Sequence, residues 1–576
     1  MTSSPLPGTA QGPHCEGGAG SACPGRPVAP HRRCLAHLAP DHARDHFESL
    51  RPGDDIDHRG TAMNADLLTR LLRSVRDPAT GKPRFGTARF EGAGFVDAAD
   101  FAGTVFTDPA YFNEATFHKE ANFSDADFEA SVFFGGAKFI DTCDFTASAF
   151  RTYAGFRGAE FGGEWTSFAD ATFHRTAGFL NARFGGRLNL TYAWLYGDLV
   201  MRRAEFTGKQ IIGPLVCAET VRFDQATFNG QTALFIAAPR IDCSASSWEA
   251  PATLRVRYAS LTFSMASFAA PLAVMKQRRP FGPEGNVLTE DPIRGVTDDD
   301  VRVVSIAATD ASLLRLVNVD LSRCGFAGAI NLDQTRIEGA CRFASTPTGL
   351  TGPYGFIPFH WTRRRTLVDE WRIRSARPGD GTSARSPVPP HEQRRRNFAV
   401  LAATYRDLRK SLEDAKDEPG AADFYYGEME MRRHSHSLRE AERWLLQAYW
   451  LLSGYGLRAS RALGWLALAM MTTVLLLMAF GLPDSAPKQE ASGTVPSGGG
   501  AVTFEIDKGD PENPTGHRFT AKRFDKALRV TLNSVVFRSS GQDMTTTGEY
   551  VEMASRFAEP VLLGLGALAI RGRLKR

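Results

Sequence analysis

Large apolar side chains recur at regular intervals between Arg84 and about Gly230. Successive phenylalanines are separated alternately by five and six residues, so the pattern has a period of eleven. Many of these positions have Ala two residues earlier. The predicted core positions include Phe90, Phe95, Phe101, Phe106, Phe112, Phe117, Phe123 and Phe128.

This period excludes a long helix and a long continuous strand. At about 100° per residue, a five-residue step splits the phenylalanines over two faces of a helix, and Gly, Asp, Asn and Thr between them are poor helix formers. In a continuous strand the odd step would send alternate phenylalanines to opposite faces. The chain is therefore predicted to turn every five or six residues, as a β-solenoid with one small and one large apolar side chain inside at each step.

The repeated A-x-F-x-x pattern resembles the Phe-rich variant of the pentapeptide-repeat family. This resemblance implies a mainly β fold, a right-handed quadrilateral β-helix with coils of about 22 residues and each Phe stacked on the Phe one coil away. With about 4.8 Å between strands, residues 88–234 would form roughly seven coils. Stacked repeats of this kind need caps at their ends.

A second run of apolar residues at five- and six-residue steps, from Leu316 to Phe343, follows a polar, Pro- and Gly-rich stretch. It predicts further coils after an insertion, with a separate small β unit as the alternative. Apolar residues at steps of three and four from Phe398 to Leu412 then predict a helix, and Pro419 marks the start of another. This helical hairpin of tetratricopeptide type resembles a segment that joins pentapeptide repeats to membrane helices in actinobacterial proteins.

Two segments are candidates to cross a membrane. Residues 462–482 contain no charge and are long enough to span a hydrocarbon core of about 30 Å. Residues 550–570 have the same length but contain three charged residues. Basic residues before the first and after the second segment place both termini in the cytoplasm by the positive-inside rule. Because Arg greatly outnumbers Lys, as in GC-rich genomes, the expected location is a bacterial cell membrane.

The segment before the second span resembles the pore loop of the two-helix potassium-channel module. An amphipathic stretch, residues 524–537, is followed by a Gly-containing loop. The resemblance places Ser539, Ser540 and Gly541 at the filter's T-V-G and Asp543 at the Asp that follows the filter, where backbone carbonyls replace an ion's water. The second glycine and the Tyr of the potassium-channel filter are absent from this sequence, and Gln542 lies in their place. The alternative is a re-entrant loop that packs two helices and conducts nothing.

Two other groups of residues are candidate sites. Glu559 lies inside the second span, where an acid costs at least a few kcal/mol unless it pairs, faces water or is protonated; the alternative is an ordinary helix pair with Arg556. Cys15, Cys23, Cys34 and His37 form a weak zinc candidate, because only Cys34-x₂-His37 approaches the usual ligand spacing. A flexible tail is the expectation there, so neither metal nor cofactor is expected.

The predicted organisation runs as follows: a flexible N-terminal region (1–60), a short helix as N-terminal cap (61–83), the repeat β-helix (84–235), degenerate repeats (236–350) with an insertion loop (271–300), a linker (351–392), the helical hairpin with a juxtamembrane helix (393–457), a first transmembrane helix (462–482), an external loop (483–525), a pore-loop-like segment (526–549), a second transmembrane helix (550–570) and a basic cytosolic tail (571–576).

Charge and motifs restrict the function. A net charge of +4 over 576 residues is too balanced for a dedicated polyanion binder, so no nucleic acid is expected. The familiar nucleotide-binding and hydrolase motifs are absent, so the protein is predicted not to be an enzyme. We expect a membrane-anchored scaffold that faces the cytosol and binds the bilayer and an unknown protein partner. One alternative is a homo-oligomeric cation channel regulated by the solenoid. A less favoured one, from the acidic residues 88–185, is a DNA mimic that binds gyrase, as some pentapeptide-repeat proteins do.

Overall fold

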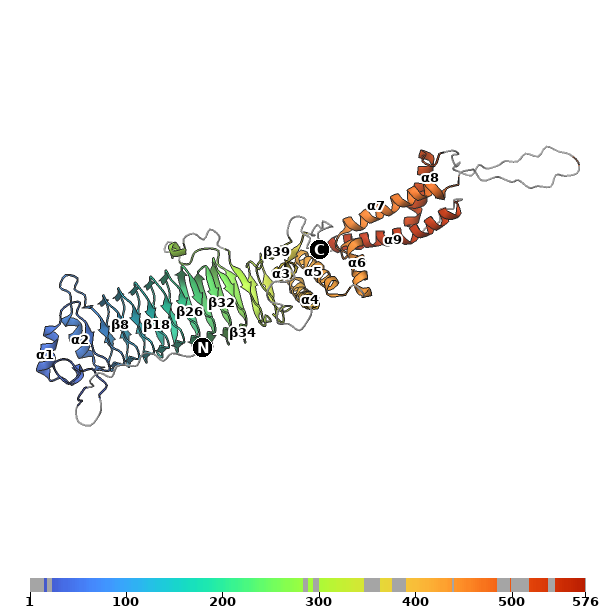
Figure 1. Ribbon diagram of the computed structural model, residues 1–576. Helices are drawn as coiled ribbons and strands as arrows, with labels where there is room; N and C mark the ends of the chain where they lie inside the picture. The colour runs from blue at the N-terminus through green and yellow to red at the C-terminus, as the bar shows by residue number, and fades with distance from the viewer. Residues whose placement is uncertain are drawn as a thin grey trace. The chain divides into compact units, whose positions relative to one another are not determined.

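The computed structural model describes residues 15–17, 23–282, 288–293, 300–346, 363–375, 390–437, 440–483, 498, 517–536 and 544–574. The described residues belong to two compact units, one within residues 1–380 and 406–417, the other within residues 381–405 and 418–576. The first is a β-solenoid and the second is helical (Figure 1).

Short parallel strands build the solenoid. The first coil has one two-residue strand on each of four sides, namely β3 (Arg84–Phe85), β4 (Ala88–Arg89), β5 (Gly94–Phe95) and β6 (Ala99–Asp100). Strands one coil apart pair in parallel and in register, so that Phe128 lies between Phe106 and Phe150. The pairing produces sheets of 11, 12, 10 and 5 strands. The predicted β-solenoid is therefore confirmed, and it has about eleven turns, more than the first repeat run alone had predicted.

Stacked aromatic rings fill the interior. Phe95 and Phe117 lie with ring centroids 4.6 Å apart and ring planes within 2°. All eight predicted core phenylalanines are buried. Similar stacks continue the Phe95 ladder through Phe117, Phe139, Phe161, Phe184, Phe206, Phe228 and Trp248. Because each ring lies directly on the ring of the next coil, the eleven-residue period becomes continuous apolar columns.

A left-handed backbone conformation recurs with the same period at the corners. Residues with positive φ follow one another every eleven positions from Gly92 to Gly158, and again from Asp170 to Arg203. The single step of twelve between these runs coincides with β18 (Trp165–Ser167), which has three residues in place of two. The inserted residue therefore shifts the register once without interrupting the stack.

The coils change shape at β26 (Gln210–Cys217). This long strand occupies two sides of the coil, and the five-stranded sheet ends one coil earlier at β22 (Arg187–Asn189). The Gln210 side chain takes the place of the missing strand: the Leu188 N–H donates to its Oε1 (3.0 Å), and its Nε2 donates to the Gly186 carbonyl (2.9 Å).

Later coils also have one long strand in place of two short ones. These long strands are β29 (Thr232–Ala237), β32 (Ala252–Arg257) and β35 (Leu272–Lys276). The register partners Val221, Ile241 and Leu261 lie 20 residues apart, in place of 22. This shorter coil is the physical reason that the sequence repeat weakens after Gln231.

The second apolar run continues the same sheets. β36 (Arg302–Ser305) pairs with β33 (Ser260–Thr262), β37 (Leu314–Val317) pairs with β35, and β38 (Arg336–Glu338) pairs with β37. These pairings favour the prediction of further coils over a separate β unit. The insertion is shorter than the expected 271–300, because Leu272–Lys276 is a strand of the sheet.

The N-terminal region differs from the flexible tail that we expected. Its described residues form η1 (Leu35–His37), α1 (Pro40–Ser49) and β1 (Ile56–Asp57), which pairs with β4. The next helix, α2 (Ala65–Ser74), lies within the predicted cap. Order extends upstream because apolar residues of this segment are buried, namely Val28, Leu35, Ala43, Phe47, Leu50, Ile56, Leu68 and Leu71.

The helices after the solenoid follow the predicted order. They are α3 (Val368–Ser375), within the expected linker, then α4 (Pro390–Asp414), α5 (Glu418–Ser435), α6 (Ala441–Ser453), α7 (Ala459–Leu476), the π-helix η3 (Leu477–Gly481), α8 (Ala521–Val535) and α9 (Thr546–Leu574). The predicted apolar stripe of α4 is buried. Residues 459–481 and 546–571 are long and apolar enough to cross a membrane, by length and composition.

Candidate functional sites

The cysteine and histidine side chains of the N-terminal region converge. The ligand atoms of Cys15, Cys23, Cys34 and His37 all lie within 4.8 Å of one another. Cys15 and Cys34 are buried, Cys23 is half-buried and His37 is exposed. The geometry thus assembles the four residues that spacing alone had marked as a weak candidate.

Backbone contacts bring these four residues together. Cys15 and Cys23 face each other in an antiparallel bridge, and the Cys15 N–H donates to the Gly25 carbonyl at 3.0 Å. The turn of η1 places His37 beside Cys34, with the His37 N–H donating to the Cys34 carbonyl at 2.9 Å. Spacing marked Cys15 and Cys23 only weakly, because residues that meet in a β-bridge need not form a short ligand motif in the sequence.

The cluster also alters the acidity of a thiol. Burial, together with hydrogen bonding and charge from Cys15 and Cys23, raises the pKa of Cys34 to about 12. Cys34 by itself is therefore a neutral thiol at physiological pH, unlike a reactive cysteine, whose pKa is lowered.

Glu559 lies between the two long apolar helices. Its side chain is fully buried, and the Thr473 hydroxyl of α7 donates to its Oε1 at 3.0 Å. Arg556 pairs with Glu552 one turn earlier. The structure therefore differs from the alternative of a Glu559–Arg556 pair, and the partner of Glu559 is a neutral hydroxyl on the neighbouring helix.

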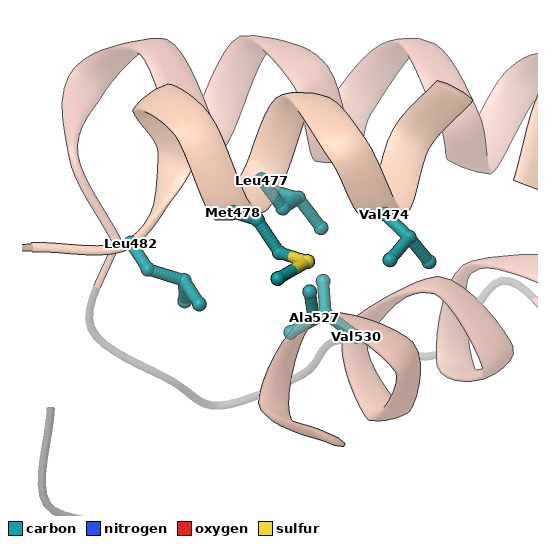
Figure 2. Close-up of a cluster of buried hydrophobic side chains, with 6 residues drawn as sticks. All are labelled: Val474, Leu477, Met478, Leu482, Ala527 and Val530. Atoms are coloured by element: carbon teal, nitrogen blue, oxygen red, sulfur yellow. The ribbon is translucent and has the colours of Figure 1, made fainter. Parts of the chain in front are cut away.

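Helix α8 packs on the end of the first apolar helix. Figure 2 shows side chains of α7, η3 and the residue after them facing Ala527 and Val530 of α8. The residues contributed from that side are Val474, Leu477, Met478 and Leu482. α8 begins three residues earlier than the predicted amphipathic stretch, because the Thr520 hydroxyl caps it by accepting from the Arg523 N–H (3.3 Å).

Arg523 is a site residue that sequence reasoning missed. Its side chain is 1% exposed, and its guanidinium donates to the carbonyls of Met478 (3.0 Å), Leu482 (2.8 Å) and Pro483 (3.1 Å). These carbonyls lie where the π-helix ends, so a cation there satisfies acceptors that no further turn can pair. Thr520 could have indicated it from the sequence: Thr is a favoured N-cap residue, and a helix that begins after Thr520 includes residue 523, which we had expected in the external loop.

The predicted filter residues Ser539, Ser540, Gly541, Gln542 and Asp543 lie outside the described residues. The packing of α8 against α7 and α9 gives no information on ion conduction. The channel hypothesis stays a prediction from resemblance.

Comparison with protein families identifies the solenoid. Residues 101–149 match the family model described as pentapeptide repeats (9 copies). The chain is a pentapeptide-repeat β-helix protein. No curated protein and no solved structure matches it. The matched repeats lie in the coils with the most regular phenylalanine ladders, and these comparisons lend no support to a channel module in this pentapeptide-repeat protein.

Proposed function

We propose that this pentapeptide-repeat protein is a membrane-anchored binding scaffold, not an enzyme, whose solenoid faces the cytoplasm of a bacterial cell. The observation that carries the proposal is the apolar surface of α7 and α9. Only 28% of the most apolar window of each helix is buried. The core helix of a soluble protein would be mostly buried, so the exposed apolar side chains need lipid or another apolar partner.

The outward residues of these helices are large. Exposed large apolar side chains on α7 and α9 include Leu463, Trp465, Leu468, Met471, Leu475, Leu476, Phe557, Val561, Leu563, Leu568 and Ile570. On α6, Trp444 and Leu445 are 63% and 67% exposed. A tryptophan just before a span suits the level of the lipid headgroups, which supports a juxtamembrane position for α6.

An outward column of aromatic rings supports a binding role for the solenoid. Tyr111 stacks on Phe133 at 5.3 Å, and Phe133 contacts Tyr153 at 5.9 Å, on one face of successive coils. The Arg89 guanidinium lies 5.0 Å from the Tyr111 ring centroid. Tyrosine and arginine are enriched among the residues that dominate protein–protein affinity, so a protein is the partner that this surface favours.

The acidic residues of the solenoid favour this role over DNA mimicry. Asp127 pairs with Arg151 at 2.7 Å and Glu160 pairs with Arg183 at 3.2 Å, each one coil away. Because basic side chains pair with acids such as these, they interrupt the negative charge along the coil stack, whereas an imitation of DNA needs unbroken negative charge.

Membrane anchoring can be tested with the full chain. The protein is reconstituted into vesicles of phosphatidylethanolamine and phosphatidylglycerol, floated, and washed with alkaline carbonate. We expect the unmodified protein to stay with the vesicles and a Leu468→Arg/Met471→Arg variant to be released, because each arginine costs about 2.5–3.5 kcal/mol at a helix centre. Met265→Arg is the matched control, since Met265 is 63% exposed on the solenoid and Met471 is 64% exposed. Release of the unmodified protein would contradict the anchor.

The binding role needs a separate experiment. A photocrosslinking residue at Tyr153 should yield a discrete protein adduct in cells, and the same residue at Met265 should not. The adduct at Tyr153 should disappear when Phe133→Ala removes the neighbouring ring. An adduct that persists in that variant would argue against the aromatic column as the binding surface.

A further inference from the structure

The cysteine and histidine cluster has the dimensions of a tetrahedral zinc site. Zn–S bonds of about 2.3 Å and Zn–N bonds of about 2.0 Å separate two sulfur ligands by about 3.8 Å, and a sulfur from a nitrogen by about 3.5 Å. The Cys23 and Cys34 sulfurs are 3.8 Å apart. His37 Nδ1 lies 3.5 Å from the Cys15 sulfur and 3.4 Å from the Cys34 sulfur.

Neither a disulfide nor ordinary apolar packing accounts for the cluster as well as a metal does. A disulfide requires sulfurs about 2.05 Å apart, whereas all three cysteines are free. Ordinary core cysteines of this chain, such as Cys143 and Cys243, are buried singly among apolar residues. Three sulfurs and an imidazole at mutual contact are the donor set of a structural zinc site of the Cys₃His type.

The backbone around the cluster is arranged to receive thiolates. The Cys34 N–H donates to the Cys15 sulfur at 3.2 Å, and the Gly25 N–H donates to the Cys23 sulfur at 3.4 Å. Such hydrogen bonds orient metal ligands. A Cβ at Gly25 would lie 2.7 Å from the Cys34 Cβ and 2.8 Å from its sulfur, so any other residue would push a ligand away.

We propose that Cys15, Cys23, Cys34 and His37 bind one zinc ion, which fastens the N-terminal segment to the first coil of the solenoid. Four protein ligands leave no open position, so the ion is structural and not catalytic. The inference is independent of the membrane anchor and of the binding role.

Contacts beside the cluster connect the ion to the solenoid. The Arg26 N–H donates to the Arg59 carbonyl at 2.7 Å, and the Arg26 guanidinium lies 3.6 Å from the Asp57 carboxylate of β1. β1 is the outermost strand of the eleven-stranded sheet. An uncovered outer strand is a template for pairing with another chain. The zinc-bound N-terminal segment therefore protects the end of the stack, as a capping repeat does.

The test measures the metal content of the full chain, purified in detergent without added metal, by inductively coupled plasma mass spectrometry. We expect about one zinc per chain, as in a structural Cys₃His site. Cys23→Ser and His37→Ala should each weaken zinc affinity by more than about tenfold, since even the loss of an outer-shell partner costs about 10–100-fold in affinity, and each variant should be purified with clearly less than one zinc per chain. Cys217→Ser is the matched control, because Cys217 is buried inside the solenoid away from the cluster, and it should keep full zinc. Cobalt(II) added to zinc-free protein should produce the visible absorption of a tetrahedral thiolate site.

Several results would overturn the proposal. These are zinc-free protein that also fails to bind cobalt, zinc that persists in both ligand variants, and a Cys23–Cys34 disulfide in protein prepared from cells under thiol-blocking conditions. His37 is exposed, so His37→Ala removes a ligand without opening the core. If that variant folds by circular dichroism and still holds one zinc per chain, the assigned ligand set is wrong.

Discussion

His58 is a buried imidazole at the point where the N-terminal cap joins the first coil. It is 1% exposed, with its ring 6.1 Å from Phe90 and 5.8 Å from His46. Neither ring nitrogen has a hydrogen-bond partner among the described residues. Burial, reinforced by the charge of His46 and only partly opposed by Asp57, lowers the pKa of His58 to about 3. The folded state therefore holds this side chain neutral.

This predicts that the cap weakens in acid. Between the ordinary pKa of 6.5 and about 3, the unfolded chain binds a proton that the folded chain excludes. Stability is complete above pH 6.5 and falls by about 1.4 kcal/mol per pH unit below it. Native-state hydrogen exchange of the β1 amides at several pH values measures the loss. His58→Leu should remove this part of the pH dependence, whereas loss of the exposed imidazole in His174→Asn should not. Equal pH profiles for the His58→Leu variant and the unmodified protein would contradict the assignment.

Adjacent phenylalanines allow a test of the interior ladder. Phe134 is buried between Phe112 (4.8 Å) and Phe156 (5.0 Å), whereas its neighbour Phe133 is half-buried on the outer face. Phe134→Ala should lower the opening free energy of neighbouring coil amides by about 3–5 kcal/mol. Phe133→Ala removes only surface stacking and should lower it by about 0.5–1.5 kcal/mol. Similar losses in the two variants would mean that the ladder does not hold the coils together.

At the scale of elements, the two long apolar helices meet at a pair of glycines. The Thr545 N–H donates to the Gly481 carbonyl at 3.0 Å, which ties the start of α9 to the end of η3. A Cβ at Gly548 would lie 2.4 Å from the Gly481 carbonyl oxygen, so the approach is possible only without a side chain. Gly564, on the same helix α9, has nothing within 4 Å of its Cβ position.

Alanine substitutions at these two glycines should therefore have opposite effects. In an open helical position Ala is favoured over Gly by about 1 kcal/mol, so Gly564→Ala should maintain or raise the thermal midpoint of the full chain in detergent. Gly548→Ala should lower it, because the added methyl group forces the helices apart. If both variants behave alike, the close crossing is absent in solution.

At the scale of the whole molecule, the proposed orientation follows from flanking charges. Both termini should be cytoplasmic, with residues 483–525 on the outer side. The native cysteines all precede residue 342, on the proposed cytoplasmic side, so labelling of a new cysteine between the two spans in intact cells reports on the outer side. In intact cells a membrane-impermeant maleimide should label Ser497→Cys and leave Glu413→Cys unlabelled until the cells are lysed. Labelling of Glu413→Cys but not of Ser497→Cys in intact cells would show the opposite orientation and contradict the prediction.

The amino-acid pattern alone was enough to predict the solenoid, because the Phe period records a local rule that repeats along the coils: one turn and one buried ring for each five or six residues. It also determined the helical order and the two apolar helices, since length and composition carry those signals. Features that depend on residues distant in the chain became apparent only in the folded molecule. Gln210 replaces a strand, Arg523 caps a helix end, and Glu559 accepts a hydrogen bond from Thr473 on another helix. Cys15 faces Cys23 in a β-bridge and accepts a hydrogen bond from the Cys34 N–H. Such contacts arise where the backbone returns to the same place, and no local period encodes that return.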